Sequence, residues 1–129
     1  GKYIAPQMIE SLSLVDKYID QVAIIADQRK FVSALIVPEF RMIEEWAREH
    51  HINFESREDL CASKEVNDMM KERIDTLQQQ LAHYEQIKRF TLLAHHFSME
   101  SGELTNTLKL RRPIICKNYK DVIDKMFEE

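Results

Sequence analysis

A loop near the end of the chain brings together residue types that bind anions. It runs from Ser98 to Pro113 and reads SMESGELTNTLKLRRP. It holds one of only two glycines in the chain, and its first cation is Lys109. A lysine ammonium is a compact charge on a flexible stem, so a loop held at both ends can present it to a carboxylate or a phosphate. Most loop lysines are simply solvated, and the cations from Lys109 to Arg112 are equally typical of an exposed basic patch.

Five histidines raise the question of a metal site, but their spacing does not favour one. His50 and His51 are adjacent, as are His95 and His96, while His83 stands alone. Neighbouring side chains on a strand point to opposite faces, and helical ligands need a spacing of three or four residues. We therefore predict no metal site.

The sequence offers no recognisable nucleophile. It lacks a G-x-S-x-G elbow, and Cys61 lies in a charged helical region without a histidine at a telling spacing. Cys61 and Cys116 show no C-x-x-C spacing, so we interpret them as reduced thiols, with a single disulfide left open by the sequence.

Composition indicates one folded domain. The 129 residues are 44% hydrophobic and 31% charged, and the net charge is -4. A mildly acidic chain is a poor candidate for binding nucleic acid. No apolar run approaches the roughly 20 residues that span a bilayer.

The first residue is Gly1 rather than Met, from which we expect a cut made inside a longer protein or the remnant of a tag. With two glycines in all, the chain has no Gly-rich phosphate loop. We expect the main part of any nucleotide site to lie elsewhere.

The first forty residues predict a helix and a hairpin. Pro6 suits the first turn of a helix that ends near Leu14. Two apolar runs, 21–26 and 31–37, are separated by four polar residues, which is typical of a β-hairpin. Both runs are apolar on both faces, so we expect the sheet to be covered on two sides.

The rest of the chain alternates between helical and strand patterns. Helical spacing begins at Glu39, Ser56 with Asp59 predicts a helix cap, and a long amphipathic helix is expected from Ser63. Its apolar stripe is Val66, Met70, Ile74, Leu77, Leu81 and Tyr84.

A third strand is predicted over 87–93, and Asn118 with Asp121 predicts the N-cap of a last helix. The resulting fold class is α+β: a small three-stranded, mostly antiparallel sheet with helices packed on it.

Three segments resemble the adenylate-forming enzyme superfamily. Residues 1–10 read G-x-x-I-x-P-x-x-I-E, which matches the second half of its hinge-proximal motif. GKYIAPQ, DQRKFVSALIVPEF and HFSMESGELTNTLKLRRPII resemble the long-chain fatty-acid–CoA ligase branch, in the same order. The resemblance covers essentially the whole chain.

This resemblance implies that residues 1–129 are the C-terminal lid domain of such a ligase. The N-terminal domain, which binds ATP and the fatty acid, is absent from the chain, and it is the expected partner. The implied enzyme is cytoplasmic, with peripheral membrane association left open. It uses ATP, CoA and Mg²⁺ to make acyl-CoA through an acyl-adenylate, and we expect the isolated domain to be inactive and to bind none of these cofactors.

The resemblance also implies roles for particular residues. Lys109 corresponds to the adenylation lysine, which acts as the catalytic cation. Gly1 corresponds to the motif glycine beside the CoA pantetheine channel, with Lys2 and Tyr3 at the channel mouth. Arg111 and Arg112 are implied contacts for CoA phosphates or for the other domain, and a solvated pair is an equal alternative.

Two positions depart from the superfamily pattern. Asn106 stands where proline is expected, so the loop is expected to be less rigid. Leu108 precedes the lysine where the wider superfamily has glycine, and the long-chain branch tolerates a bulkier residue there.

A second hypothesis is a free-standing interaction module. It would bind an acidic partner or nucleic acid through the long helix or the basic patch of residues 109–112, with an affinity that falls steeply as salt rises. The acidic net charge argues against it.

Overall fold

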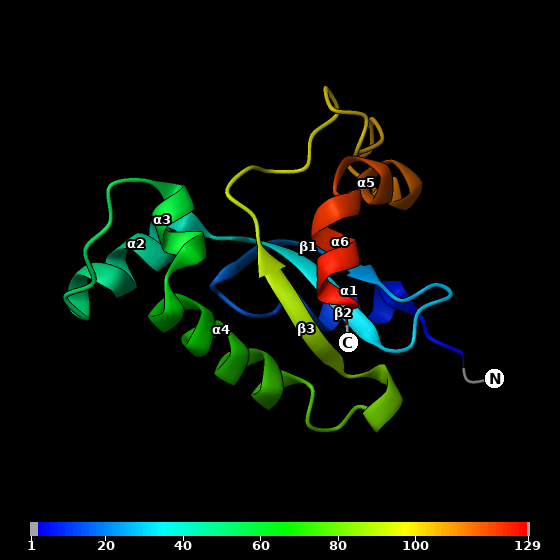
Figure 1. Cartoon of the computed structure of the whole chain (residues 1–129), viewed down its shortest axis with the longest axis horizontal. Helices are drawn as coiled ribbons and strands as arrows, with labels where there is room; N and C mark the ends of the chain where they lie inside the picture. Colours follow the sequence, from blue (N-terminus) through cyan, green and yellow to red (C-terminus); the bar gives the residue numbers. More distant parts are fainter. Residues whose placement is uncertain (1–2, 129) are drawn as a thin grey trace.

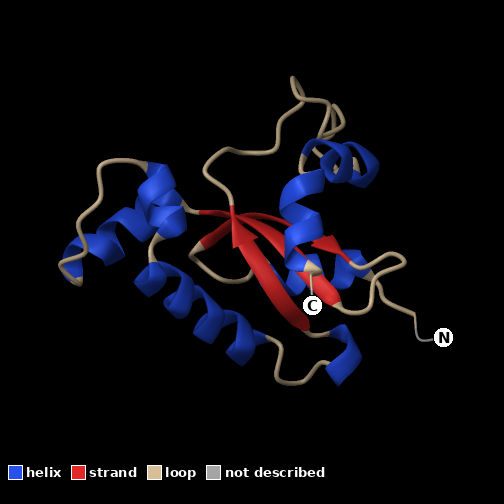
Figure 2. Ribbon diagram, in the orientation of Figure 1, coloured by secondary structure: helices blue, strands red, loops and turns tan. Residues whose placement is uncertain are grey.

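A three-stranded sheet in the order β1-β2-β3 forms the centre of the structure, a computed structural model that describes residues 3–128 (Figures 1 and 2). Strand β1 spans Ile19–Ile25, β2 spans Val32–Pro38 and β3 spans Ile87–Leu92. The hairpin and the third strand predicted from the sequence are therefore confirmed.

The sheet is mixed, which differs from the mostly antiparallel sheet expected. Strands β1 and β2 pair antiparallel, whereas β2 and β3 pair parallel. Only a long crossover allows the parallel pairing, because the chain must return to the same end of the sheet. Three α-helices and a short 3-10 helix between β2 and β3 provide this crossover. The sequence pattern identifies the strands but carries no direct signal for their direction.

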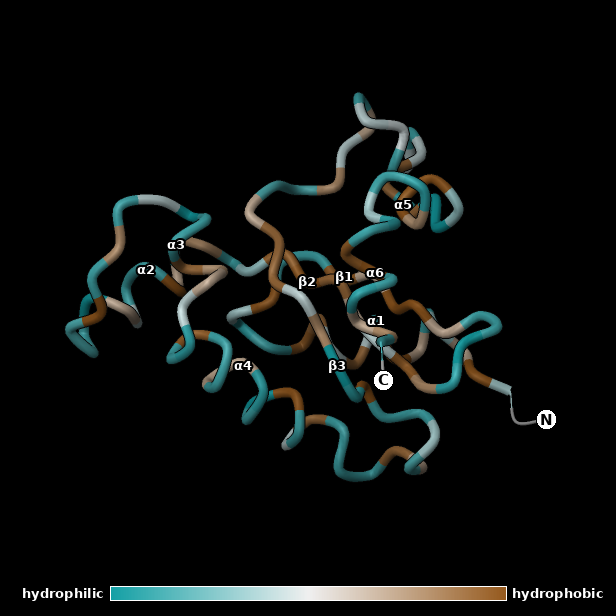
Figure 3. The backbone as a smooth tube through the Cα atoms, viewed as in Figure 1, coloured by the Kyte–Doolittle hydropathy of each residue, from teal (hydrophilic) through white to brown (hydrophobic). Residues whose placement is uncertain are grey.

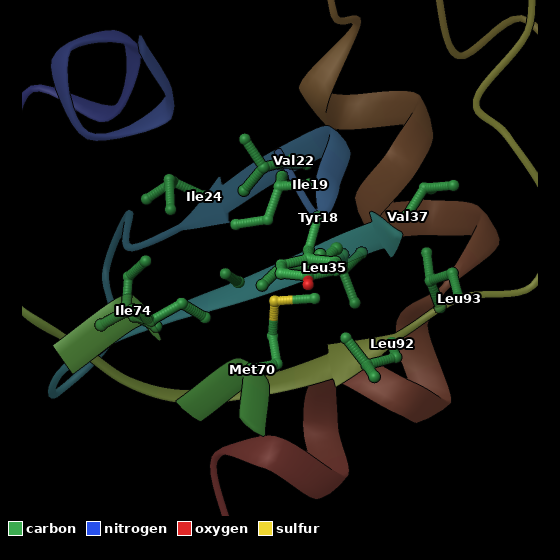
Figure 4. Packing of buried hydrophobic residues seen from close by; sticks show 14 of the residues in the cluster. Tyr18, Ile19, Val22, Ile24, Leu35, Val37, Met70, Ile74, Leu92 and Leu93 are labelled. Atoms are coloured by element: carbon green, nitrogen blue, oxygen red, sulfur yellow. The ribbon is translucent and has the colours of Figure 1, made fainter. Parts of the chain in front are cut away.

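Strand β2 is the core of the domain. All of its residues are buried, so both faces of the sheet are covered, as the two apolar runs predicted. In Figure 3 the hydrophobic colouring is concentrated along β1 and β2, while hydrophilic and hydrophobic residues alternate along α4. Figure 4 shows Met70 of α4 pointing toward Leu35 in the middle of the sheet.

The four N-terminal helices begin where the sequence signals indicated. Helix α1 spans Pro6–Ser13, with a proline in its first turn, and α2 spans Phe40–Glu49. Ser56 caps α3 (Arg57–Ala62) by accepting a hydrogen bond from the Asp59 amide, as predicted. Ser63 caps α4 (Lys64–Leu77) in the same way, through the amide of Val66.

Helix α4 ends earlier than its apolar stripe suggested. It stops at Leu77, so Leu81 and Tyr84 lie beyond it, and a short 3-10 helix, η1 (His83–Glu85), precedes β3. The Gln78 amide explains the early end, because it pairs with the backbone of Ile87 through bonds of 3.0 and 2.7 Å. The side chain thereby satisfies both backbone groups of Ile87 at the buried start of the edge strand β3.

Two helices, α5 (Arg112–Asn118) and α6 (Lys120–Met126), close the chain where one was expected. Asn118 was predicted to cap the last helix, and this was wrong. It is the last residue of α5, and its amide donates to the Glu103 carboxylate at 2.9 Å. The Asn118 side chain therefore bonds to Glu103, which is distant in sequence, instead of capping the next helix.

A largely buried ion pair joins the first helix of the domain to the start of α5. The Arg112 guanidinium contacts the Glu10 carboxylate at 2.6 and 3.3 Å and also donates to the Ile24 carbonyl at 2.7 Å. The same carboxylate accepts the Ile24 amide at 2.8 Å. Helix α1, strand β1 and the start of α5 thus meet at one set of charge-assisted hydrogen bonds.

Within residues 3–128 no helix has both the length and the apolarity needed to cross a bilayer.

Replacing Glu10 with alanine should strongly destabilise the domain. The change leaves a largely buried guanidinium and a buried amide without their acceptor, which costs about 3 kcal/mol or more. Urea unfolding of the chain followed by circular dichroism measures this loss. The matched control is Asp75→Ala, which removes an exposed partner of Lys71 and should change the unfolding free energy by less than about 1 kcal/mol. Equal losses of unfolding free energy in the two variants would show that the Glu10–Arg112 pair stabilises the domain no more than an exposed pair does.

Candidate functional site

The segment 98–111, called here the lysine loop, connects β3 to α5. In Figure 1 the chain between β3 and α5 rises away from the sheet at the top of the view. Its start is fixed to β1, because the Gln21 amide accepts the Phe97 N–H at 2.7 Å and donates to the Phe97 carbonyl at 3.2 Å. Its end is fixed by Arg112 through the ion pair to Glu10. Both ends of the loop are therefore tied to the same part of the fold.

The first half of the lysine loop is folded on itself. The amides of Glu103 and Leu104 both donate to the Ser98 carbonyl, at 3.1 and 3.0 Å. Gly102, with a φ of +79°, supplies the left-handed turn that this winding requires. The Glu103 side chain is only 4% exposed and accepts from Asn118, and its carbonyl accepts the Arg111 amide at 2.7 Å. Glu103 thus ties the middle of the loop to α5.

Lys109 lies in a narrow turn at the far end of the loop. Leu104 and Leu110 form an isolated antiparallel bridge, and the Thr105 amide donates to the Lys109 carbonyl at 2.8 Å. The Lys109 amide donates in return to the Thr105 hydroxyl at 3.0 Å. Thr107 also contacts that hydroxyl, at 3.1 Å. The backbone of Lys109 is therefore fixed by hydrogen bonds, although Asn106 replaces the proline expected in the turn.

The residue before the lysine has an unusual backbone. Leu108 has a φ of +63°, in the left-handed region that suits glycine. A leucine in this conformation costs roughly 1–2 kcal/mol relative to the right-handed one. This is the position at which glycine was expected from the superfamily pattern, and glycine adopts a left-handed backbone without strain.

The Lys109 side chain is exposed, and its ammonium has no hydrogen-bond or ion-pair partner within residues 3–128. A groove of about 1200 Å³ crosses β3 between α4 and α6, and Lys109 does not line it. The described part of the chain thus presents the lysine on an open surface. An ammonium in this setting contacts an anion in a water-poor site only if a second body covers it.

The remaining predicted site residues differ in their exposure and in their contacts. Gly1 and Lys2 lie outside the described residues, and the Tyr3 side chain is 80% exposed. Arg111 is exposed, whereas the guanidinium of Arg112 is engaged by Glu10 and Ile24. The geometry therefore assigns Arg112 to the support of the loop and leaves Arg111 available for a ligand or a partner.

Sequence reasoning missed three residues that hold the loop. Glu10 and Glu103 both stand within segments that carried the family resemblance, so a buried carboxylate in each could have been suspected. Gln21 begins an apolar run and gave no signal of its own. Its role depends on a residue 76 positions away, which no local pattern can show.

The fold matches adenylate-forming enzymes of known structure. The adenylation domain of the carboxylate reductase from Mycobacterium chelonae superposes with a TM-score of 0.81 at 18% identity, over 100% of this chain and 18% of that one. The adenylation domain of carboxylic acid reductase from Segniliparus rugosus, in complex with AMP and a co-purified carboxylic acid, gives 0.77 at 17% identity, over 98% and 18%. The class of fold is thus that of a small domain within these larger enzymes.

The chain belongs to the AMP-binding enzyme C-terminal domain family, whose family model matches residues 1–129. Long-chain-fatty-acid–CoA ligase 1 of Homo sapiens is 32% identical over 98% of this chain and 18% of its own length. The peroxisomal long chain acyl-CoA synthetase 7 of Arabidopsis thaliana is 30% identical over 100% of the chain and 19% of its length. The chain therefore spans about a fifth of the curated relatives it matches, and the family resemblance predicted from its sequence is confirmed.

Both cysteines are free thiols, and neither is set up as a nucleophile. Burial, with a smaller contribution from the Glu58 carboxylate, raises the pKa of Cys61 to about 11. Burial also raises the pKa of Cys116. Across the described residues no three histidine, cysteine, aspartate or glutamate side chains gather where a metal ion could be held.

Cys61 should react slowly with alkylating agents, because the thiolate is the reactive form. With a pKa of about 11, its thiolate at pH 8 is scarcer than that of free cysteine by about a hundredfold, and the iodoacetamide rate should fall accordingly. A Cys116→Ser background isolates the site, and mass spectrometry follows the product. The rate should still be climbing at pH 10 in the folded chain, and unfolding in urea should restore the ordinary profile. A plateau near pH 9 in the folded chain would contradict the assignment.

Proposed function

We propose that this chain is the mobile C-terminal domain of an AMP-forming long-chain fatty-acid–CoA ligase, and that Lys109 acts in its adenylation half-reaction. The observation that carries the proposal is the placement of Lys109. Its ammonium is exposed and unpaired within residues 3–128, on a turn whose backbone is fixed and whose loop is tied to β1 and α1. The names of the relatives supply the substrate class, a long-chain fatty acid.

The proposed chemistry explains why a lysine belongs there. In the first half-reaction a fatty-acid carboxylate oxygen attacks the α-phosphorus of ATP, and the bond from that phosphorus to pyrophosphate breaks. Two anionic groups approach one another, so a preorganised cation that contacts both stabilises the transition state. Such a contact is strongest where water is excluded, and its loss costs about 10²–10³-fold in rate.

The second half-reaction does not need the same cation. The CoA sulfur attacks the acyl carbon, the carbon–oxygen bond to AMP breaks, and the thioester forms. We propose that the domain then turns a different face to the active site, with Gly1, Lys2 and Tyr3 beside the pantetheine channel. Arg111, which is exposed, is the available contact for a CoA phosphate or for the N-terminal domain.

ATP, the fatty acid and Mg²⁺ belong with the N-terminal domain in this scheme. The interaction-module hypothesis gains nothing from the comparisons, because the whole chain matches the C-terminal part of enzymes.

Substituting Lys109 should separate the two half-reactions. In the full-length enzyme, Lys109→Ala should slow pyrophosphate release from ATP and palmitate by about 10²–10³-fold. The same variant should convert supplied palmitoyl-adenylate and CoA to the thioester at close to the unmodified rate. Both steps are measured in single-turnover experiments, with pyrophosphate detected by a coupled assay and acyl-CoA by chromatography.

Lys125→Ala serves as the matched control, since it removes an exposed lysine on the separate helix α6. It should leave both rates unchanged. An equal loss of both half-reactions in Lys109→Ala, or no loss in either, would refute the proposed role.

A further inference from the structure

Leu108 combines two features that folding alone does not favour. Its backbone is in the left-handed region, at a φ of +63°, and its side chain is 65% exposed. The strain of the first is not offset by burial of the second. Within residues 3–128 the other non-glycine residues with positive φ are Gln28 and His51, both polar, so Leu108 is the one aliphatic residue in this conformation.

The position of Leu108 indicates where such a side chain would be used. It directly precedes Lys109, and consecutive Cα atoms are about 3.8 Å apart. The hydrogen bonds from Leu108 and Lys109 to Thr105 hold both residues in one turn. A surface that receives the Lys109 ammonium therefore comes close to the exposed Leu108 side chain. Strained residues persist where the surroundings or the function require them.

We propose that Leu108 is a positioning residue for Lys109. The Leu108 side chain docks into an apolar depression of the N-terminal domain when the C-terminal domain is in its adenylation orientation. The inference rests on the proposed function and adds a specific contact to it. Burial of the leucine in the closed enzyme would orient the turn and exclude water beside the ammonium. A cation in a drier site interacts more strongly with the reacting carboxylate and phosphate.

Substitutions at position 108 distinguish a docking role of the Leu108 side chain from a role of its backbone conformation alone. Glycine relieves the left-handed strain but removes the side chain, and asparagine tolerates the same backbone while being polar. Methionine keeps the apolar volume. If Leu108 acts by docking, Met should function, whereas Gly, Ala and Asn should not. If only the backbone conformation matters, Gly and Asn should function as well as Leu.

The experiment measures both half-reactions in the full-length enzyme carrying Leu108→Gly, Leu108→Ala, Leu108→Asn or Leu108→Met. The first three should slow pyrophosphate release with palmitate by about 10- to 100-fold, the effect of losing one buried leucine contact. These three variants should convert supplied palmitoyl-adenylate to thioester within about twofold of the rate of the unmodified enzyme. That change is much smaller than their expected loss of adenylation. Leu108→Met should keep the rate of pyrophosphate release within severalfold of the rate of the unmodified enzyme.

Thermal unfolding of the 129-residue chain checks that these losses do not come from unfolding. Leu108→Gly should melt at the same temperature or a few degrees higher, because strain is relieved and little burial is lost. Full adenylation activity in Leu108→Gly or Leu108→Asn would overturn the inference, as would equal loss of both half-reactions. Lys109→Ala, assayed in parallel, keeps the two proposals apart: if it loses adenylation while Leu108→Gly does not, the docking contact alone fails, and if it retains adenylation, the proposed function fails.

Discussion

The ion pair between Glu10 and Arg112 is the interaction on which the rest of the site depends. It joins residues 102 positions apart in the chain, and the Glu10 carboxylate also satisfies the Ile24 amide of β1. Buried charges are costly unless they are paired and hydrogen-bonded, and here both conditions are met. A single carboxylate thus fixes the first helix, the first strand and the base of the lysine loop relative to one another.

The anchoring of the lysine loop follows the same logic at its other end. The Gln21 amide holds Phe97 to β1, so both ends of the loop are attached to one strand of the sheet. Glu103 and Asn118 connect the middle of the loop to α5. The loop is long and rises from the sheet (Figure 1), and backbone hydrogen bonds join its residues to one another at both its start and its far turn. Rigidity at the base lets a side chain at the far end be aimed at a second body.

Within residues 3–128 the Lys109 ammonium, at the far end of the lysine loop, has no partner, and this has a physical consequence. An exposed lysine without a counter-ion contributes little to the stability of its own domain and keeps its capacity for an external anion. The strained Leu108 beside it follows the same pattern, because its conformation adds nothing to folding. In contrast, Arg112 belongs to the same basic run and is fully engaged inside the domain. Adjacent cations in one sequence motif thus serve the fold and the surface separately.

Local patterns were sufficient for the strands, the capped helices and the position of the candidate lysine. Ser56 and Ser63 cap helices through contacts within three residues, and the apolar runs of β1 and β2 reflect burial on both faces. Such features depend on neighbours in the chain, so a single sequence determines them.

Other features depended on contacts between distant residues. The parallel pairing of β3, the early end of α4 at Gln78 and the engagement of Asn118 by Glu103 all required partners that no sequence window contains. Residue types and spacing predicted a lysine in a loop between a strand and a helix, and the family resemblance made that lysine the candidate. Only the tertiary structure decided that, among the residues it describes, Lys109 has no partner and Arg112 has one, because only Arg112 reaches the carboxylate of Glu10.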